Sequence, residues 1–262
     1  MKGGEIIQFI TDWLAGYAKE AGAAGFVVGV SGGIDSAVAS TLAARTGLYL
    51  LCIEMPIYQG PAQAARAKDH ISFLKKNYLN ACSCEVDLSR VFDQLTKALP
   101  EAEETPARER SLVNVRARLR MTTLYYFAAL YNYLVLGMGN KVEDFGIGFF
   151  TKYGDGGVDL SPIGDLTKSE VYKLGEALGV IDSIMKAPPT DGLWGNNRTD
   201  EDQIGASYPE LEWAMDFRGD EACLGQRELE VLRIYRTCHN LNRHKMEPVP
   251  VCRIPRHLLE AG

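Results

Sequence analysis

The sequence predicts an α/β fold in which a parallel, twisted sheet carries helices on both faces. Short, fully apolar segments alternate with helical ones along the first half of the chain, as in sheets whose strands are buried on both sides. In addition, the first apolar segment runs directly into a Ser-Gly-Gly turn and a helix start. That connection is typical of a strand followed by a crossover helix.

The individual elements follow from hydrophobic periodicity. An amphipathic helix is predicted over Glu5 to Ala21, where apolar side chains recur at helical spacing. Strands are predicted from short apolar runs at Gly25 to Val30, Tyr49 to Ile53, Ser83 to Asp87 and Tyr133 to Gly137. Further helices are predicted at Ser36 to Thr46, Pro61 to Asn77, Leu88 to Leu99, Asn114 to Tyr131, Lys168 to Leu178, Tyr208 to Met215 and Gln226 to Leu241.

Two polar stretches interrupt this pattern. Met138 to Gly164 is rich in glycine and too long for a passive connector, so it is expected to be a functional loop. Pro188 to Gln203 is open to two interpretations, a mobile lid or an ordinary solvated loop. No internal repeat or linker divides the sequence, so residues 1–262 are expected to form a single domain.

Composition excludes several classes of protein. A net charge of −6 argues against general nucleic-acid binding, and no apolar run is long enough to predict a membrane span. A chain of 262 residues buries an ample core without disulfides. Six scattered cysteines, with no secretory segment at the N-terminus, favour reduced thiols and a cytoplasmic location.

The segment Ser31-Gly32-Gly33-Ile34-Asp35-Ser36 has the chemistry of a phosphate-binding loop. Glycine lets the backbone take positive φ and approach a ligand closely, and the following helix directs its positive dipole end at the same point. The two serines add hydroxyl donors, and Asp35 provides a carboxylate where a phosphate-bound Mg²⁺ would sit. The alternative interpretation is a Gly-rich turn that only packs, because the Lys of the mononucleotide P-loop is missing.

This loop resembles that of the N-type ATP pyrophosphatases, which cleave ATP between its α and β phosphates. Five further segments, read in order, resemble the ammonia-dependent NAD synthetases within that superfamily; they are Asn114 to Met121, Leu136 to Glu143, Gly148 to Asp159, Leu166 to Val171 and His244-Lys245. The resemblance covers nearly the whole chain. It implies the Rossmann-like fold of the adenine nucleotide alpha hydrolases.

The resemblance also implies the residues of the site. ATP, the co-substrate, would contact Ser31, Gly32, Gly33, Ile34, Asp35, Ser36, Lys168 and Thr190. Mg²⁺ would be held by Asp35 and Glu143, and deamido-NAD would contact Arg118, Lys152, Asp159, His244 and Lys245.

Some of these residues carry a signal of their own. Lys168 begins a predicted helix, where a cation opposes the helix dipole, so its placement favours a phosphate partner. Arg116 and Arg120 are interpreted as solvated helix charges, and Asp155 as a residue that shapes the turn. Met138 departs from the family pattern, which has Thr there, so a hydroxyl contact to ATP is not expected at this position.

The expected reaction is the ATP-dependent amidation of deamido-NAD to NAD, through an adenylate and with release of AMP and pyrophosphate. Ammonia is the expected nitrogen donor, because the sequence leaves no room for the amidohydrolase domain of glutamine-using relatives. The resemblance implies a homodimer. Two alternatives remain: a pyrophosphatase of this superfamily that adenylates a nucleobase or tRNA, and a non-catalytic sensor of adenine nucleotides.

Overall fold

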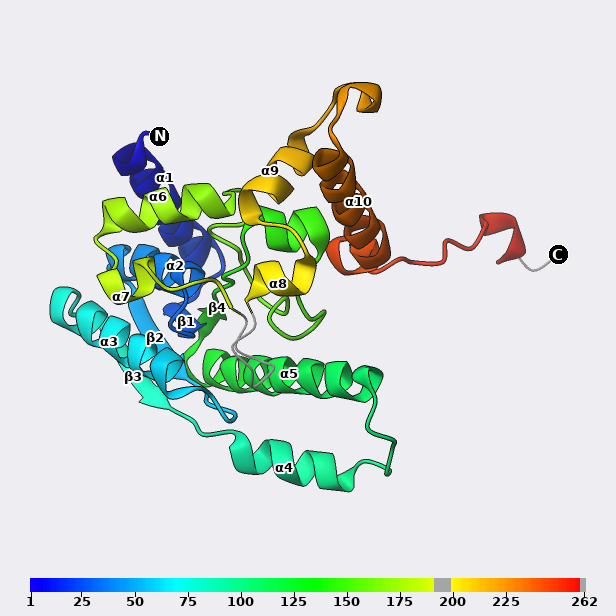
Figure 1. The fold of residues 1–262 in the computed structure, drawn as a ribbon. Helices are drawn as coiled ribbons and strands as arrows, with labels where there is room; N and C mark the ends of the chain where they lie inside the picture. Colours follow the sequence, from blue (N-terminus) through cyan, green and yellow to red (C-terminus); the bar gives the residue numbers. More distant parts are fainter. Residues whose placement is uncertain (191–198, 260–262) are drawn as a thin grey trace.

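The computed structural model describes residues 1–190 and 199–259, which contain a four-stranded sheet with all strands parallel, in the order β3-β2-β1-β4 (Figure 1). The strands are β1 (Gly25–Gly29), β2 (Tyr49–Glu54), β3 (Ala81–Glu85) and β4 (Tyr133–Val135). The predicted parallel sheet is therefore confirmed.

The strand order changes direction beside β1. The chain proceeds from β1 to β2 and β3 on one side, and β4 then pairs with the other side of β1, with Gly25 opposite Tyr133. Ligands of open α/β sheets bind where the strand order reverses, outside the carboxyl ends of the strands. In this sheet, that position lies between the segment that follows β1 and the segment that follows β4.

Helices surround the sheet as predicted, although several bounds differ. The α-helices are α1 (Gly3–Glu20), α2 (Ile34–Arg45), α3 (Pro61–Asn77), α4 (Ser89–Ala98), α5 (Pro106–Tyr131), α6 (Lys168–Leu178), α7 (Asp182–Met185), α8 (Asp200–Ile204), α9 (Tyr208–Asp216) and α10 (Gln226–Met246). Shorter turns are the π-helix η1 (Lys141–Ile147) and the 3₁₀ helices η2 (Glu221–Cys223) and η3 (Arg256–Leu258).

Two of the differing bounds can be explained by capping, which outweighs apolar periodicity there. Helix α5 begins at Pro106 rather than Asn114, since the Thr105 hydroxyl accepts a hydrogen bond from the Arg108 amide at 3.2 Å. Strand β3 ends at Glu85, and Asp87 instead accepts a hydrogen bond from the amide of Ser89, the first residue of α4.

The two faces of the sheet bury separate apolar clusters. On one face, α1, α2 and α6 contribute Leu14, Leu42 and Leu174, whose side chains are fully buried. On the other face, α4 and α5 contribute residues that include Phe92 and Leu124. The prediction of helices on both faces is confirmed by this arrangement.

A third apolar cluster joins η1 to α9 and α10, beyond the edge of the sheet (Figure 1). It packs Val142 of η1 against Leu211 of α9 and Val231 of α10. In this way the segment after β4 is held in place by the C-terminal helices. That residues 1–262 form a single domain stays a prediction.

The two polar stretches contain regular structure that was not predicted. Met138 to Gly164 includes η1 and an isolated parallel bridge between Leu136 and Leu160, so much of it is ordered rather than a plain loop. The expected lid, Pro188 to Gln203, lies partly outside the described residues, and α8 begins within its last part. Within the described ranges, no helix is long and apolar enough to cross a membrane.

Candidate functional site

The turn between β1 and α2 has a backbone that requires glycine. Gly32 adopts φ +79°, in the left-handed region. A Cβ added to Gly32 would lie 2.6 Å from the carbonyl oxygen of Gln63 and 2.9 Å from the amide nitrogen of Ala67. No other residue fits there without moving the start of α3, because both obstacles are backbone atoms.

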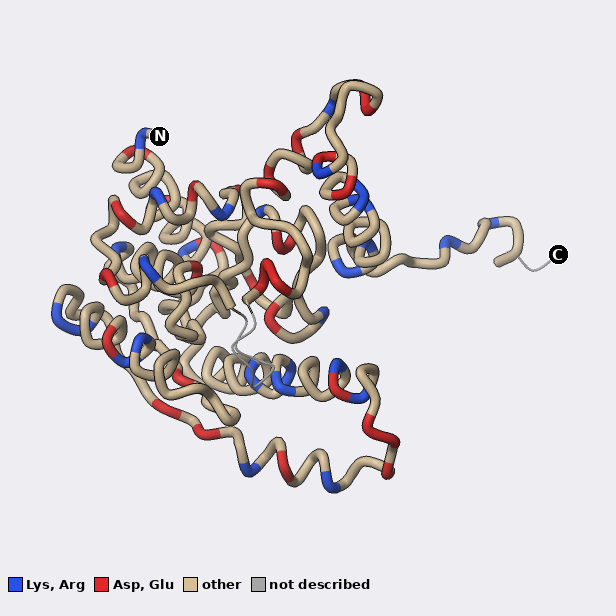
Figure 2. The backbone as a smooth tube through the Cα atoms, viewed as in Figure 1, with Lys and Arg blue, Asp and Glu red and all other residues tan. Residues whose placement is uncertain are grey.

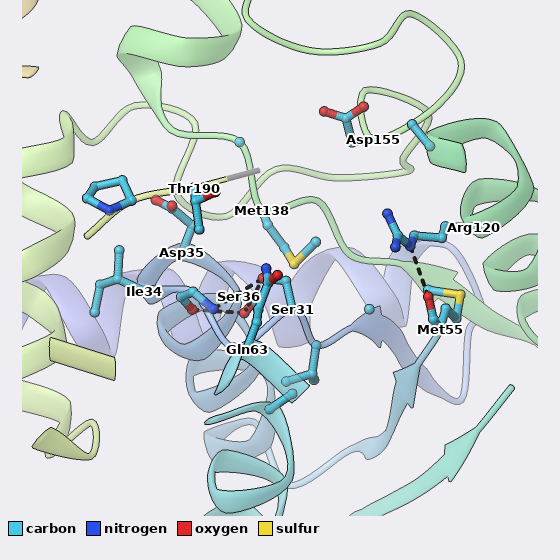
Figure 3. Close-up of a pocket in the computed structure, with 18 of the residues that line it drawn as sticks. Ser31, Ile34, Asp35, Ser36, Met55, Gln63, Arg120, Met138, Asp155 and Thr190 are labelled. Carbon is cyan, nitrogen blue, oxygen red and sulfur yellow. Dashed lines mark hydrogen bonds between the residues drawn. The ribbon is translucent and has the colours of Figure 1, made fainter. Parts of the chain in front are cut away.

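Hydroxyl groups brace this turn from inside (Figure 3). The Ser31 hydroxyl accepts a hydrogen bond from the Gly33 amide at 3.2 Å and donates to Ser36 Oγ at 3.1 Å. The Ser36 hydroxyl in turn donates to the carbonyl oxygen of Gly33 at 2.9 Å, and Ser36 is only 2% exposed. Both hydroxyls thus support the shape of the loop, while the cavity beside it is lined by the whole of Ser31 to Ser36.

A buried cation lies between two carboxylates at the end of the crevice. Lys168 Nζ is 2.6 Å from Asp35 Oδ2 and 2.9 Å from Glu143 Oε1. The three side chains come from α6, α2 and η1, and are 4%, 18% and 15% exposed respectively. Although they are remote in sequence, the fold brings these three predicted site residues into one cluster.

The electrostatics of this cluster follow from burial and pairing. Burial alone would lower the pKa of Lys168, but attraction to Asp35 and Glu143 outweighs it and raises the pKa above the usual value, so the amine is an ammonium. Burial raises the pKa of Asp35, and the charge of Lys168 offsets only part of that rise. A cation is therefore the natural occupant of the space between the two carboxylates.

Asn140 connects the Asp35 carboxylate to the backbone of Glu143, and it was not identified from the sequence. It is fully buried, and its amide nitrogen lies 3.3 Å from Asp35 Oδ1. Its side-chain oxygen accepts hydrogen bonds from the amides of Val142 and Glu143, both at 3.1 Å, and so caps η1. The signal was present, because an Asn after a strand-end Gly-Met-Gly is a favoured helix N-cap.

Tyr208, the first residue of α9, was also missed. Its hydroxyl donates a short hydrogen bond to Glu143 Oε1 and lies 3.2 Å from Asp200 Oδ2, while Lys168 Nζ is 4.6 Å from the ring centroid. Burial, together with the charges of Glu143 and Asp200, raises the pKa of the Tyr208 hydroxyl, so it stays a donor. The sequence around Tyr208 signals only a helix start.

A cavity of about 360 Å³ opens beside the loop (Figure 3), and the buried Lys168 is among the residues that line it. This volume is within the range of small-ligand pockets. All the predicted ATP contacts line it, and so do Glu143 and Met138. Thr190 lies across from the loop, near Asp35, in Figure 3.

Four of the five predicted deamido-NAD residues, Arg118, Lys152, His244 and Lys245, are brought together outside this cavity. Arg118 Nη2 donates to the Lys152 carbonyl at 3.2 Å, and Lys152 Nζ donates a short hydrogen bond to the His244 carbonyl. Lys245 Nζ bonds the carbonyls of Gly148 and Phe150, at 2.8 and 2.7 Å. None of Arg118, Lys152, Asp159, His244 and Lys245 lines the cavity as formed by residues 1–190 and 199–259.

Asp159 is tied into the sheet edge. Its Oδ2 accepts a hydrogen bond from the Val135 amide at 2.7 Å, and its Oδ1 accepts one from the Tyr125 hydroxyl at 3.0 Å. These bonds fix the end of the Gly-rich segment to β4 and α5, so Asp159 positions that segment.

The interpretation of Arg116 and Arg120 as solvated charges is wrong. Arg120 lines the cavity, and its Nε donates to the Met55 carbonyl at 3.0 Å (Figure 3). The Arg116 guanidinium lies over the Phe92 ring, 4.6 Å from its centroid. Helix α5 packs against α4 and the end of β2. These neighbours contact Arg116 and Arg120, which the spacing of apolar residues within the helix alone would place in solvent.

Two further carboxylates face the cavity, those of Asp144 and Asp155. Asp155 accepts a hydrogen bond from the Thr151 amide at 3.0 Å, so it does shape the turn, as predicted, and it also lines the cavity. Asp144 lies against Gly139, where an added Cβ would be 1.9 Å from its Oδ2. Burial raises the pKa of both carboxyls.

The residues present fit a magnesium ion that arrives with a nucleotide. Asp35 and Glu143 offer hard oxygen ligands and already surround a positive charge. Within the described residues, no three His, Cys, Asp or Glu side chains form a ready metal site, so phosphate and water would supply the other ligands. Elsewhere on the molecule, basic residues outnumber acidic ones along α3 and α10 (Figure 2).

Comparisons with known proteins agree with this geometry. The sequence model of the NAD synthase family matches residues 6–248. The NH(3)-dependent NAD(+) synthetase of Carboxydothermus hydrogenoformans is 41% identical over 79% of this chain and 83% of its own. That of Syntrophomonas wolfei is 35% identical over 97% of both chains. Among solved structures, the NMN synthetase of Francisella tularensis superposes with a TM-score of 0.85 at 31% identity, covering 97% of this chain and 100% of its own.

Proposed function

The chain belongs to the NAD synthase family, and from this premise we propose that it amidates deamido-NAD to NAD with ammonia and ATP. The observation that carries the proposal is the convergence of the Ser31 to Ser36 loop, Lys168 and two carboxylates on one nucleotide-sized cavity. A carboxylate needs activation before ammonia can replace its oxygen, and ATP supplies that activation.

The reaction proceeds in two steps. The nicotinate carboxylate attacks the α-phosphorus of ATP, forming an acyl-adenylate and releasing pyrophosphate. Ammonia then adds to the activated carbonyl, and AMP leaves with the former carboxylate oxygen. The residues of the cavity contribute mainly alignment and charge stabilisation, because neither step requires a nucleophilic side chain.

The phosphate loop and Lys168 stabilise the departing pyrophosphate. The residues at the start of α2 line the cavity, where a helix N-terminus favours an anion, and Gly32 permits the close approach of α3 that shapes the loop. Asp35 and Glu143 would hold Mg²⁺, which when bound neutralises charge on the phosphates. Lys168, the ammonium of the same cluster, would then be available to bind a phosphate oxygen.

A second substrate deserves a direct test, nicotinate mononucleotide. The solved structure with a TM-score of 0.85 is named an NMN synthetase. Both substrates present the same nicotinate carboxylate, and they differ in the adenylyl half. The residues assigned to the dinucleotide, such as Arg118 and Lys152, lie outside the described cavity, so the reacting end can be bound without them.

The deciding experiment is an incubation with ATP, Mg²⁺ and each nicotinate nucleotide, with and without ammonium. We expect NAD, with continuing release of AMP and pyrophosphate, when ammonium and deamido-NAD are both present. Comparing kcat/KM for the two nucleotides then ranks the substrates. Bound but uncleaved ATP would instead indicate a nucleotide sensor, and AMP formation without either nucleotide would indicate another pyrophosphatase.

We also propose a homodimer in the cytoplasm. The C-terminal half of α5 leaves large apolar side chains in solvent, with Tyr126 63%, Leu130 55% and Tyr131 48% exposed. Such a face is suited to burial against a second copy. The six cysteines are all unpaired, which is the usual state in a reducing compartment.

A further inference from the structure

Glu143 is restrained through one of its two carboxylate oxygens. Oε1 accepts hydrogen bonds from Lys168 Nζ, at 2.9 Å, and from the Tyr208 hydroxyl. Among the described residues, none donates to Oε2. Two donors occupy the lone pairs of Oε1, so Oε2 is the oxygen presented to a ligand.

Tyr208 itself is held firmly. It is 3% exposed and packs in the apolar cluster of η1, α9 and α10. Its backbone amide donates to Glu201 Oε1 at 2.9 Å, and its ring lies beneath the Lys168 ammonium. Tyr208 is thus restrained at its backbone, its ring and its hydroxyl. Because it cannot move with Glu143, its hydrogen bond limits the movement of the Glu143 carboxylate.

The two donors to Glu143 Oε1, Lys168 and Tyr208, are expected to behave differently when ATP binds. Lys168 is the residue expected to turn toward ATP, and Oε1 then loses its cationic partner. The Tyr208 hydroxyl is not expected to turn toward a phosphate, because it lies between the carboxylates of Glu143 and Asp200. It is the donor that remains on Oε1 when nucleotide is bound.

We propose that Tyr208 is a positioning residue for this reaction, whose hydroxyl fixes Oε1 of Glu143 so that Oε2 faces the divalent cation that accompanies ATP. The inference rests on the proposed function, since it requires a metal–nucleotide complex in the cavity. It assigns the role to the hydroxyl alone, and the ring serves packing.

The test compares Tyr208→Phe with Tyr235→Phe by direct metal binding. Tyr235 is half-buried in the same apolar cluster, and within the described residues no hydrogen bond reaches its hydroxyl, so it is a matched control. Mn²⁺ binding is measured by electron paramagnetic resonance with α,β-methylene ATP, which cannot be cleaved at the scissile position. We expect Y208F to weaken Mn²⁺ binding roughly 10- to 100-fold, and Y235F to leave it within about twofold of wild type.

Two further measurements separate positioning from structure. Binding of adenosine needs the cavity but no metal, so it should be unchanged in Y208F. In a Glu143→Gln background, Y208F should cause no additional loss of Mn²⁺ affinity, because its effect passes through Glu143. Additive losses, or an unchanged Mn²⁺ affinity in Y208F alone, would overturn the inference.

A variant that leaves Tyr208 in place guards against a folding defect. Glu143→Asp draws the carboxylate back from the hydroxyl without disturbing the packing of the ring, and it should weaken Mn²⁺ binding to a similar extent. Wild-type affinity in E143D contradicts the inference. Failure of the wild-type protein to bind Mn²⁺ with the nucleotide analogue would instead contradict the proposed function.

Discussion

The ammonium nitrogen of Lys168 lies 2.6 Å from Asp35 Oδ2, although 133 positions separate the two residues in the chain. The same nitrogen contacts Glu143 Oε1, so one buried cation holds two carboxylates together. Asp35 is in the first turn of α2, Glu143 in η1 and Lys168 at the start of α6. The cluster therefore marks the point where α2, η1 and α6 meet.

Lys168→Met should destabilise the protein and make it depend on metal. It leaves two buried carboxylates without a counter-charge, a change that typically costs about 3–5 kcal/mol. Added Mg²⁺ should restore more stability to this variant than to wild type, as measured by urea unfolding. Lys186→Met is the control, since the Lys186–Asp182 pair is exposed and its loss should cost at most about 1 kcal/mol. Equal stability of K168M and wild type would contradict this account of the cluster.

Gly32→Ala should lower stability and weaken ATP binding by more than the strain of a positive φ would cause on its own. Gly22→Ala is the matched control, because Gly22 also has positive φ, +66°, but no atom lies within 4 Å of its added Cβ. We expect G22A to lose roughly 1–3 kcal/mol of stability from strain and to keep its KM for ATP. G32A should lose more and raise the KM for ATP, because its Cβ meets the backbone of α3. Indistinguishable effects of the two variants would show that the close approach at Gly32 is unimportant.

Lys152→Ala and Arg118→Ala should separate the two candidate substrates. Arg118 is joined to Lys152 through the Lys152 carbonyl, outside the cavity. We propose that only the longer dinucleotide reaches this place. We expect each variant to raise the KM for deamido-NAD about tenfold or more, by the loss of one charged hydrogen bond, with little change for ATP. The KM for nicotinate mononucleotide should stay near the wild-type value. If ATP and deamido-NAD weaken equally, the assignment of this segment to the dinucleotide is wrong.

His70 should make stability fall in mild acid. The ring is fully buried, its Nε2 lies 2.9 Å from Ser40 Oγ, and burial lowers the pKa of His70 from 6.5 to about 4. The unfolded chain therefore binds a proton that the folded chain rejects between these values, so stability is complete above pH 6.5 and declines as the pH falls toward 4.

The loss attributable to His70 should reach about 3 kcal/mol. Urea unfolding of wild type and His70→Leu gives the free energy of unfolding of each protein across this pH range. The loss attributable to His70 is the amount by which the wild-type value falls further than the His70→Leu value. His70→Leu lacks the titrating group, so its stability should depend less on pH. Parallel curves would show that the imidazole is not held neutral.

Leu130→Lys should dissociate the proposed dimer. A charge on the exposed face of α5 would have to be buried without a partner in the interface. Light scattering after gel filtration should give a dimer for wild type and a monomer for L130K. Leu79→Lys is the control, because Leu79 is fully exposed and remote from α5 in the chain. A dimer that survives L130K would place the interface elsewhere.

The sequence was most informative where neighbours along the chain decide the structure. Buried apolar runs predicted the parallel strands, and the Ser31 to Ser36 turn predicted a strand followed by a helix. Both depend on local periodicity and on the backbone freedom of glycine. Element ends were less accurate, as at Pro106, because a single capping hydroxyl can extend a helix beyond its apolar pattern.

Contacts between distant segments could not be predicted in the same way. Arg120 was assigned to solvent from its spacing, yet it lines the cavity because α5 passes beside the end of β2. Tyr208 carried no chemical signal at all, since its partner Glu143 is 65 positions away. Such pairings depend on which elements pack together.

The sequence by itself determined the Ser31 to Ser36 turn, the parallel sheet and the family to which the chain belongs, because these are properties of short segments and of their order. Only the tertiary structure decided that Lys168 is enclosed by Asp35 and Glu143, and that the residues assigned to the dinucleotide stand apart from the cavity. The physical reason is that strand order and helix packing set the distances between remote side chains, and burial then sets the strength of their charges.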